Sequence, residues 1–420
     1  MTAIVGILNK NAIVVASDSA ETIGEGFKIY NNANKIFTLS KYHPVGIAVY
    51  NNAVFNSRIP WDIIIKMYRQ HLGRNSKDTL KEYVDDFYMF LSTFKDQHLT
   101  KTEQDDIMTD EVLGFLNSEL LAQIPNYKDT YKLKKEDLPQ LRHILYLINQ
   151  KSKEFPKIRE LSSVTKEQFR QSTYSRILSV FKLITNKEEL ETIVTEVIDS
   201  LFEFFTRTIV KRQVFSGLVF FGYGKTEIYP SLYETIVYNS FCGQLYWELK
   251  DESRITNAPN SAFICPLAQK DVMDTYISGI SLTIEETFIN STVETIKLVL
   301  DSIQNSVKKY NPELAAAVGK IDLEPILNQY RKGVSEFKQE HEIDPLMVTV
   351  STLEKEDLAE LAENLIALTS LKRRITPYIE SVGGPVDVAI VSKGDGFIWK
   401  KRKHYFNPEL NRSFFDKYYE

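Results

Sequence analysis

This chain of 420 residues has few cysteines, few histidines and a small net charge, and each of these features excludes a class of protein. Only Cys242 and Cys265 are present, so we expect no disulfide framework, and this usage suits the reducing cytoplasm. The six histidines are scattered and none has zinc-type spacing, so we expect no metal and no other cofactor. Acidic and basic residues nearly balance at a net charge of −5, which leaves no basic footprint for nucleic acid.

Long apolar runs are also missing. No stretch reaches the roughly 18 residues that a membrane span needs, and no signal peptide precedes the first run of strand-forming residues. We therefore expect a cytoplasmic protein that binds neither membrane nor nucleic acid.

What the sequence does have is a threonine directly behind the initiator methionine, at the start of a β-rich hairpin. Residues 2–18 read TAIVGILNKNAIVVASD, two strand-like runs separated by residue types that favour a tight connection. If the loop is centred on Lys10, antiparallel pairing places Thr2 opposite Asp18, at a distance of roughly 5 Å. The register would then bring the carboxylate to the terminal threonine.

Two more strand-like runs follow, 35–39 (KIFTL) and 45–50 (VGIAVY), separated by a His-Pro turn. We expect these four strands to form a meander that holds Thr2, Asp18 and Lys35 together. A hydroxyl nucleophile, an acid and a cation would then meet at one strand end.

The segments TAIVGI, VASDSAET, ANKIFTL and VGIAVY resemble the opening of proteasome β-type subunits and of the peptidase subunit of the bacterial ATP-dependent two-component protease. Both are N-terminal nucleophile (Ntn) hydrolases. The resemblance implies an α+β fold, a four-layer αββα sandwich of two antiparallel sheets. It also implies catalytic roles for Thr2, Asp18 and Lys35, although the interval to Lys35 is one residue longer than is usual in the family.

The chemistry of the family explains these residue types. A threonine hydroxyl is a weak nucleophile and needs a neighbouring base. Once Met1 is removed, the α-amine of Thr2, with an unperturbed pKa of about 8, can accept the hydroxyl proton, usually through a water. Lys35, held by Asp18, would favour the alkoxide. The reaction would hydrolyse a peptide or other amide bond through an acyl-enzyme ester.

The resemblance is inexact after the fourth strand. The family usually has a glycine there, whose backbone N–H helps to form the oxyanion hole, and this chain reads Tyr50, Asn51 and Asn52. A backbone N–H or an asparagine side chain would have to serve as the donor. The loss of one such donor typically costs about 3 kcal/mol of transition-state stabilisation.

A second resemblance lies near the C-terminus, where a Gly-Gly pair precedes PVDVAIV, a KGDG turn and FIWKKRK. This pattern is similar to the closing hairpin of the family, which follows a supporting aspartate and serine. Glu380 and Ser381 are the nearest candidates for those two roles, though their intervals differ from the family's. Helix capping and turn formation remain the alternative for both.

The rest of the chain predicts one domain spanning 1–420 with helical insertions at 56–212 and 283–375. Residues 215–222 predict a buried strand and 234–249 one or two more, similar to the second sheet of the family. Apolar residues at helical spacing predict helices within the insertions. Two capping-box patterns predict the helix starts in the second insertion, Thr283 with Glu286 and Ser351 with Glu354.

Two functional classes remain. The first is a threonine-type Ntn hydrolase, which the resemblance would also allow to form a homo-oligomer or to dock an unfoldase. The second is a catalytically inactive sandwich that serves as a scaffold or sensor. The opening trio of residues favours the first class. The missing glycine and the inexact C-terminal match favour the second.

Overall fold

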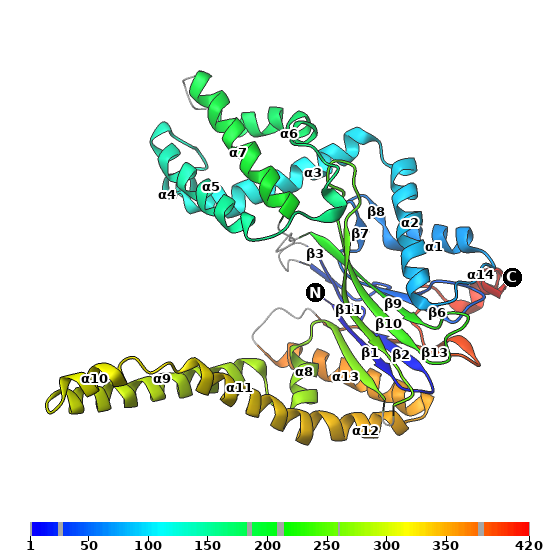
Figure 1. Ribbon diagram of the computed structural model, residues 1–420. Coiled ribbons are helices and arrows are strands. Elements are labelled where there is room, and N and C mark those ends of the chain that lie inside the picture. Colours follow the sequence, from blue (N-terminus) through cyan, green and yellow to red (C-terminus); the bar gives the residue numbers. More distant parts are fainter. Residues whose placement is uncertain are drawn as a thin grey trace.

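Two antiparallel sheets lie face to face at the centre of the chain in the computed structural model, which describes residues 2–23, 28–182, 187–207, 214–258, 261–376 and 382–419 (Figure 1). The first sheet has the strand order β12 (Phe263–Ala268), β1 (Ala3–Leu8), β2 (Ile13–Ser17), β13 (Asp387–Ser392) and β14 (Gly396–Lys401). The second has the order β11 (Trp247–Arg254), β10 (Ser231–Tyr238), β9 (Phe215–Gly222), β6 (Val45–Asn51) and β5 (Ile36–Thr38). Two short pairs accompany them, β3 (Glu21–Ile23) with β4 (Lys28–Tyr30) and β7 (Val54–Phe55) with β8 (Ile59–Pro60).

Strand β1 is apolar on both faces because each face meets a different layer. Ile4 and Leu8 belong to the core between the two sheets, whereas Val5 and Ile7 pack with residues of the helical layer on the other side. The two sheets approach closely at Gly6, where an added Cβ would lie 2.6 Å from the Leu232 side chain. Continuous apolar runs of this kind are typical of strands that are covered on both faces.

A helical layer covers the outer face of each sheet. Helices α8 (Asp271–Ser278), α12 (Asp344–Thr352) and α13 (Lys355–Ile375) supply residues to the core on the first sheet, and α1 (Trp61–Leu72) and α2 (Leu80–His98) do so on the second. The order of layers is therefore helix, sheet, sheet, helix. This confirms the α+β sandwich of two antiparallel sheets that the sequence predicted.

Two further groups of helices extend from the sandwich (Figure 1). The first consists of α3 (Lys101–Phe115), α4 (Pro125–Thr130), α5 (Leu138–Lys153), α6 (Lys166–Val180) and α7 (Lys187–Arg207), whose core also includes Tyr238, Phe241 and Tyr246 from β10 and the segment after it. The second consists of α9 (Leu282–Lys308), α10 (Pro312–Val318) and α11 (Glu324–Lys338). Helix α14 (Arg412–Tyr419) ends the described chain, and none of the helices in the described ranges is long and apolar enough to cross a membrane.

The predicted register of the first hairpin is wrong by one residue, because Ile4 lies opposite Ser17 and not opposite Ala16. The cause is the side chain of Asn9. Its Oδ1 accepts hydrogen bonds from the backbone N–H groups of Asn11 at 2.9 Å and Ala12 at 3.3 Å, which closes a longer turn than the sequence predicted. Thr2 is therefore not the residue directly across from Asp18.

The predicted four-strand meander is also wrong. Strands β1 and β2 lie in the first sheet, and β5 and β6 lie in the second. Because β1 and β2 also pair with β12 and β13, which come from distant parts of the sequence, neither has a free edge for β5. Lys35 consequently approaches Thr2 from the opposite sheet.

Both predicted capping boxes are displaced. Helix α9 begins after Ser281, whose side chain accepts a hydrogen bond from the backbone N–H of Ile284, so Thr283 lies inside the helix. Helix α13 has Glu354 itself as its N-cap residue. Ser351 lies inside α12, where its hydroxyl donates to the carbonyl of Val348 at 2.7 Å.

Candidate functional site

The carboxylate of Asp18 is fully buried just beyond the end of β2, and each of its oxygens accepts two hydrogen bonds. Oδ1 accepts from Lys35 Nζ at 2.7 Å and from the backbone N–H of Ala3 at 3.0 Å. Oδ2 accepts from the backbone N–H groups of Ala20 and Gly383, both at 3.1 Å. One side chain thus ties together the N-terminal strand, the lysine from the other sheet and the Gly-Gly segment before β13.

Lys35 is also buried, with 6% of its surface exposed. Its Nζ donates to the carbonyl oxygen of Ala20 at 2.6 Å as well as to Asp18. Burial lowers the pKa of Lys35, and the neighbouring Asp18 opposes that effect by stabilising the charged form. The result is a fixed ammonium group in surroundings with little water, where its field is only weakly screened.

Thr2 and Lys35 line the same cavity, whose volume is about 220 Å³. Tyr50, Asn51 and Asn52 line it as well, so the predicted nucleophile, cation and oxyanion segment meet at one place. Asp18 is not part of the lining and lies behind Lys35. The structure therefore brings these residues together, although by a different route from the predicted meander.

The one-residue shift in register decides how Thr2 is placed. Asp18 pairs with Ala3, whose carbonyl oxygen accepts the backbone N–H of Asp18 at 3.2 Å. Side chains alternate along a strand, so Thr2 faces the same side as Ile4, which packs between the sheets. The carbonyl of Thr2 accepts the backbone N–H of Gln269 at 3.1 Å. Thr2 is thus aimed at the second sheet, from which Lys35 comes.

Asn51 adopts the left-handed backbone conformation that glycine accepts most readily, with φ of 69°. Asparagine is among the few other residues that tolerate it. The Asn51 side chain donates to the carbonyl of Phe215 at 2.8 Å, and the Asn52 Oδ1 accepts the backbone N–H of Val54 at 3.2 Å. In these bonds Asn51 uses its amide donor, whereas Asn52 uses its acceptor oxygen.

The backbone N–H of Asn51 lies on the edge of β6 that faces β5. The N–H of Val49 donates to the carbonyl of Lys35 at 2.8 Å, on the edge of β6 that faces β5. Because N–H groups alternate between the two edges of a strand, the N–H of Asn51 points to that same edge. Ala33 and Asn34 line the cavity there.

We expect the conformation of Asn51 to govern stability at this position. Asn51→Gly should leave the free energy of unfolding nearly unchanged, whereas Asn51→Val should lower it by about 1–2 kcal/mol, since a β-branched side chain is strained at positive φ. Urea denaturation of the two variants measures the difference. Equal stability of the two variants would contradict the assignment.

The hydroxyl of Tyr50 is not placed to stabilise an oxyanion, because it already has a hydrogen-bond partner. It donates to Oε1 of Glu234 at 2.6 Å, and Lys250 Nζ donates to that same oxygen at 2.9 Å. Burial and then the neighbouring Glu234 raise the pKa of Tyr50, so the phenol stays protonated. Sequence reasoning missed Glu234, which is 1% exposed; its signal was a single acid within the strand-like run LYETIVY.

A third buried carboxylate, Asp387, lies opposite Ser17 in the first sheet and was also missed. It forms an ion pair with Lys403, whose backbone N–H it accepts at 2.9 Å. Glu380 and Ser381, the predicted supporting residues, lie outside the described residues. The hydrogen bond from Gly383 to Asp18 shows that the following segment does reach the site.

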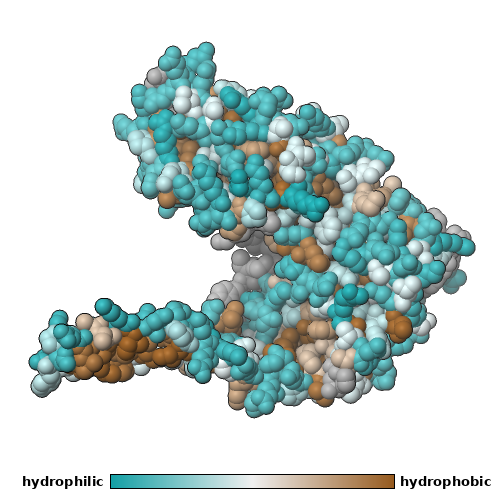
Figure 2. Space-filling view, viewed as in Figure 1, coloured by the Kyte–Doolittle hydropathy of each residue, from teal (hydrophilic) through white to brown (hydrophobic). Residues whose placement is uncertain are grey.

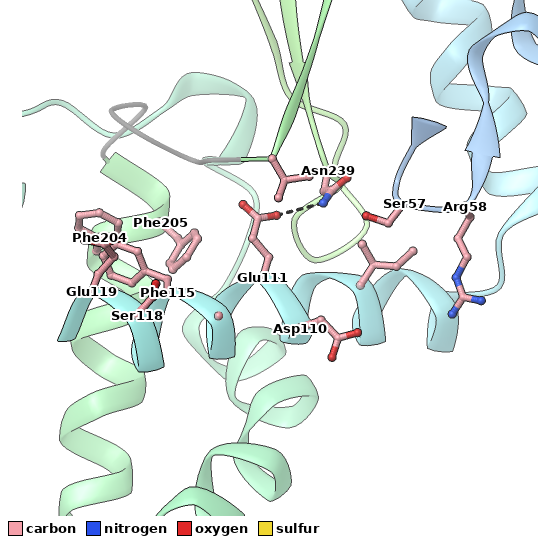
Figure 3. A pocket seen from close by; sticks show the side chains of 13 residues that line it. Ser57, Arg58, Asp110, Glu111, Phe115, Ser118, Glu119, Phe204, Phe205 and Asn239 are labelled. Carbon is pink, nitrogen blue, oxygen red and sulfur yellow. Dashed lines mark hydrogen bonds between the residues drawn. The ribbon is translucent and has the colours of Figure 1, made fainter. Parts of the chain in front are cut away.

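A larger cavity, of about 570 Å³, lies between α3, the end of α7 and the turn before β8 (Figure 3). Ser57 and Arg58 border it on one side, and Phe115 and Phe205 on another. It contains none of the residues predicted for catalysis. Size alone therefore does not identify the candidate site. The smaller cavity is lined by the predicted nucleophile Thr2 and the predicted cation Lys35.

Neither Cys242 nor Cys265 forms a disulfide within the described residues. Loss of hydration raises the pKa of Cys265 to about 11, so its thiol stays protonated near neutral pH. Cys242 lies beside Met108, with the two sulfur atoms 3.6 Å apart.

Together, the fold and this site define a four-layer α+β sandwich in which an N-terminal strand ends at a buried Asp-Lys pair, as the resemblance to Ntn hydrolases implied. Neither a protein-family model nor a curated protein matches the chain. Among solved structures, it is similar to the Anbu (Gly-1) mutant from Hyphomicrobium sp. strain MC1. That similarity has 11% identity, 99% coverage of this chain, 94% coverage of the other and a TM-score of 0.28. A likeness this low carries no argument about the function of this chain.

Proposed function

We propose that this chain is a threonine-type Ntn hydrolase that cleaves peptide or other amide bonds, with Thr2 as nucleophile after removal of Met1. The observation that supports this most is the shared cavity of Thr2 and Lys35. Asp18 holds Lys35 there through a buried hydrogen bond of 2.7 Å. This is the combination of hydroxyl and fixed positive charge that amide hydrolysis by threonine requires.

In this mechanism the Thr2 hydroxyl attacks the carbonyl carbon of the scissile amide. The α-amine of Thr2 takes the hydroxyl proton and later passes it to the leaving amine, so that an ester forms between Thr2 and the acyl group. A water then attacks the ester, with the α-amine again as the base, and releases the acid. The fixed charge of Lys35 favours the alkoxide form of Thr2 in the first step.

The oxyanion of each tetrahedral intermediate needs a hydrogen-bond donor. We assign this role to the backbone N–H of Asn51, because its edge of β6 faces the cavity and the Tyr50 hydroxyl and Asn51 side-chain amide have other partners. A backbone donor survives any substitution that keeps the positive φ. Donors of this kind typically contribute about 3 kcal/mol to catalysis.

The alternative function is an inactive sandwich that serves as a scaffold or sensor. The engagement of the Tyr50 hydroxyl and of the Asn51 side-chain amide in other hydrogen bonds favours it, because an oxyanion needs donors of this kind. The two functions differ in what they require of the N-terminus. Only the hydrolase needs a free amine on Thr2.

We expect the purified protein to lack Met1, since a threonine in the second position is small enough for methionine aminopeptidase. Intact mass spectrometry measures this as a mass lower by one methionine residue. Thr2→Glu, with a larger second residue, is the control and should retain Met1. Retention of Met1 in the wild-type protein would leave the proposed base on the wrong residue and would favour the scaffold.

We also propose that 56–212 and 283–375 are helical insertions into one domain. The pairing of β2 with β13 supports this, because strands from the two ends of the chain complete one sheet. Within these bounds, helices α1, α2, α12 and α13 cover the sheets as outer layers of the sandwich, and helices α3–α7 and α9–α11 would be the additions.

A further inference from the structure

Helices α9, α10 and α11 form an arm that projects away from the sandwich and carries a band of apolar residues (Figures 1 and 2). The arm has almost no core of its own. Among residues 279–343, all of them described, only Ala315 and Leu327 are buried. Most apolar side chains of the arm therefore stand in water, which is costly for a surface of this size.

Helix α9 has three distinct faces when its residues are placed at 100° intervals. One face, which includes Ile289, Ile296 and Leu300, is half-buried, and Glu285 on it pairs with Lys338 of α11 at 2.6 Å. The second face carries most of the charged residues of the helix. The third face is open and has no charge between Ile284 and Ile303; its residues are Ile284, Phe288, Ser291, Thr292, Thr295, Leu298, Val299, Ser302 and Ile303.

The open face is more apolar than its composition suggests. Phe288 is 62% exposed and Val299 is 52% exposed. The hydroxyls of Thr292 and Thr295 donate to the carbonyls of Phe288 and Ser291 one turn earlier, both at 2.8 Å. These threonines therefore satisfy their polar atoms within the helix, as buried threonines do. An apolar helix face without charge is typical of a surface that another protein covers.

We propose that a second copy of this chain covers this face, with the two α9 helices packed antiparallel across a two-fold axis. Twelve large apolar side chains of the arm are exposed. Five of them, Ile284, Phe288, Leu298, Val299 and Ile303, lie on the open face of α9; at roughly 80 Å² each they supply on the order of 400 Å², about half of the roughly 800 Å² per partner of a standard stable interface. The remaining area would come from the other seven exposed apolar side chains of the arm.

The spacing of the open face supports self-association. Its central row consists of Ile284, Phe288, Thr292, Thr295, Val299 and Ile303. The intervals are four, four, three, four and four residues, so the row reads the same in both directions. In an antiparallel pair, Phe288 then faces Val299 of the partner subunit, and the two threonines lie at the crossing point. Small residues at the crossing let the helices approach, and a self-complementary patch is what a two-fold dimer requires.

Cysteine cross-linking tests this register. In a Cys242→Ser/Cys265→Ser background, Phe288→Cys together with Val299→Cys should give a covalent dimer on mild oxidation. The two positions lie 11 residues apart on one helix. At 1.5 Å rise per residue, this is about 16 Å, too far for a bond within one chain. The matched control is Glu286→Cys with Lys297→Cys, which has the same spacing on the charged face and should remain monomeric on a denaturing gel.

Light scattering after size-exclusion chromatography provides the second measurement. Phe288→Asp with Val299→Asp should halve the molar mass of the native particle without loss of helical circular dichroism. A wild-type chain that is monomeric at tens of micromolar would overturn the proposal, and so would an unchanged mass in the aspartate variant. Equal cross-linking of both cysteine pairs would overturn the register. None of these readouts depends on hydrolysis at Thr2.

Discussion

Thr2→Ala should abolish both amide hydrolysis and covalent labelling by an epoxyketone probe, a reagent that reacts with an N-terminal threonine. We expect a loss of roughly a thousandfold or more, because removal of a nucleophile leaves only the contributions of binding and oxyanion stabilisation. Labelling, followed by intact mass, measures the effect without knowledge of the substrate. Alanine is also small enough for Met1 to be removed, so the N-terminal amine is preserved in the variant.

Thr2→Ser is the matched control, since it keeps the hydroxyl and the amine and should still be labelled. Thr2 lies just before the start of β1 with 8% of its surface exposed, so neither substitution opens a large cavity in the core. Equal labelling of wild-type protein and Thr2→Ala would remove Thr2 as the nucleophile. The inactive scaffold would then be the better reading of the same fold.

The sequence predicted the sandwich because its central strands are short apolar runs at the two ends of the chain. Residues 215–222 form β9 as predicted, and the KGDG turn joins β13 to β14. β12 escaped notice because Pro266 interrupts its pattern, and a proline is tolerated there because β12 lies at the edge of its sheet. Edge strands of this kind carry little signal in a single sequence.

The candidate site was predicted by residue type and resemblance more than by geometry. Thr2, Asp18 and Lys35 do lie near one another, but they come from two sheets and not from one meander. The strands at 263–268 and 387–392 that pair with β1 and β2 are too distant in sequence to be predicted from the N-terminal segment. The turn register depended on Asn9, whose Nδ2 also donates to the carbonyls of Val350 and Leu353. A contact so distant in sequence could not be read from residues 2–18.

Asp18→Ala should lower the free energy of unfolding by about 3–5 kcal/mol, the usual effect of removing one partner from a buried ion pair. The variant leaves the Lys35 ammonium buried without its carboxylate and leaves three backbone N–H groups without an acceptor. Chemical denaturation at pH 7 measures the loss. Lys401→Ala is a control, since its ion pair with Glu363 lies at the surface and should contribute about 1 kcal/mol or less.

The pH dependence separates the charge from the lost hydrogen bonds. Burial lowers the pKa of Lys35 in the folded state, so the unfolded chain binds more protons between that pKa and the ordinary value of 10.5. The contribution of Lys35 to stability therefore rises with pH across this window. Without Asp18 the pKa of Lys35 falls further and the window extends to lower pH, so the stability deficit of Asp18→Ala should shrink as the pH rises.

A second variant separates the two effects in another way. Asp18→Ala combined with Lys35→Met removes the stranded charge and should recover part of the lost stability at neutral pH, while its stability should no longer carry the Lys35 dependence on pH. If the double variant were as unstable as Asp18→Ala at every pH, the ion pair would be irrelevant to folding. Asp18 would then act only through the backbone groups of Ala3, Ala20 and Gly383, and the fixed charge proposed beside Thr2 would lose its main support.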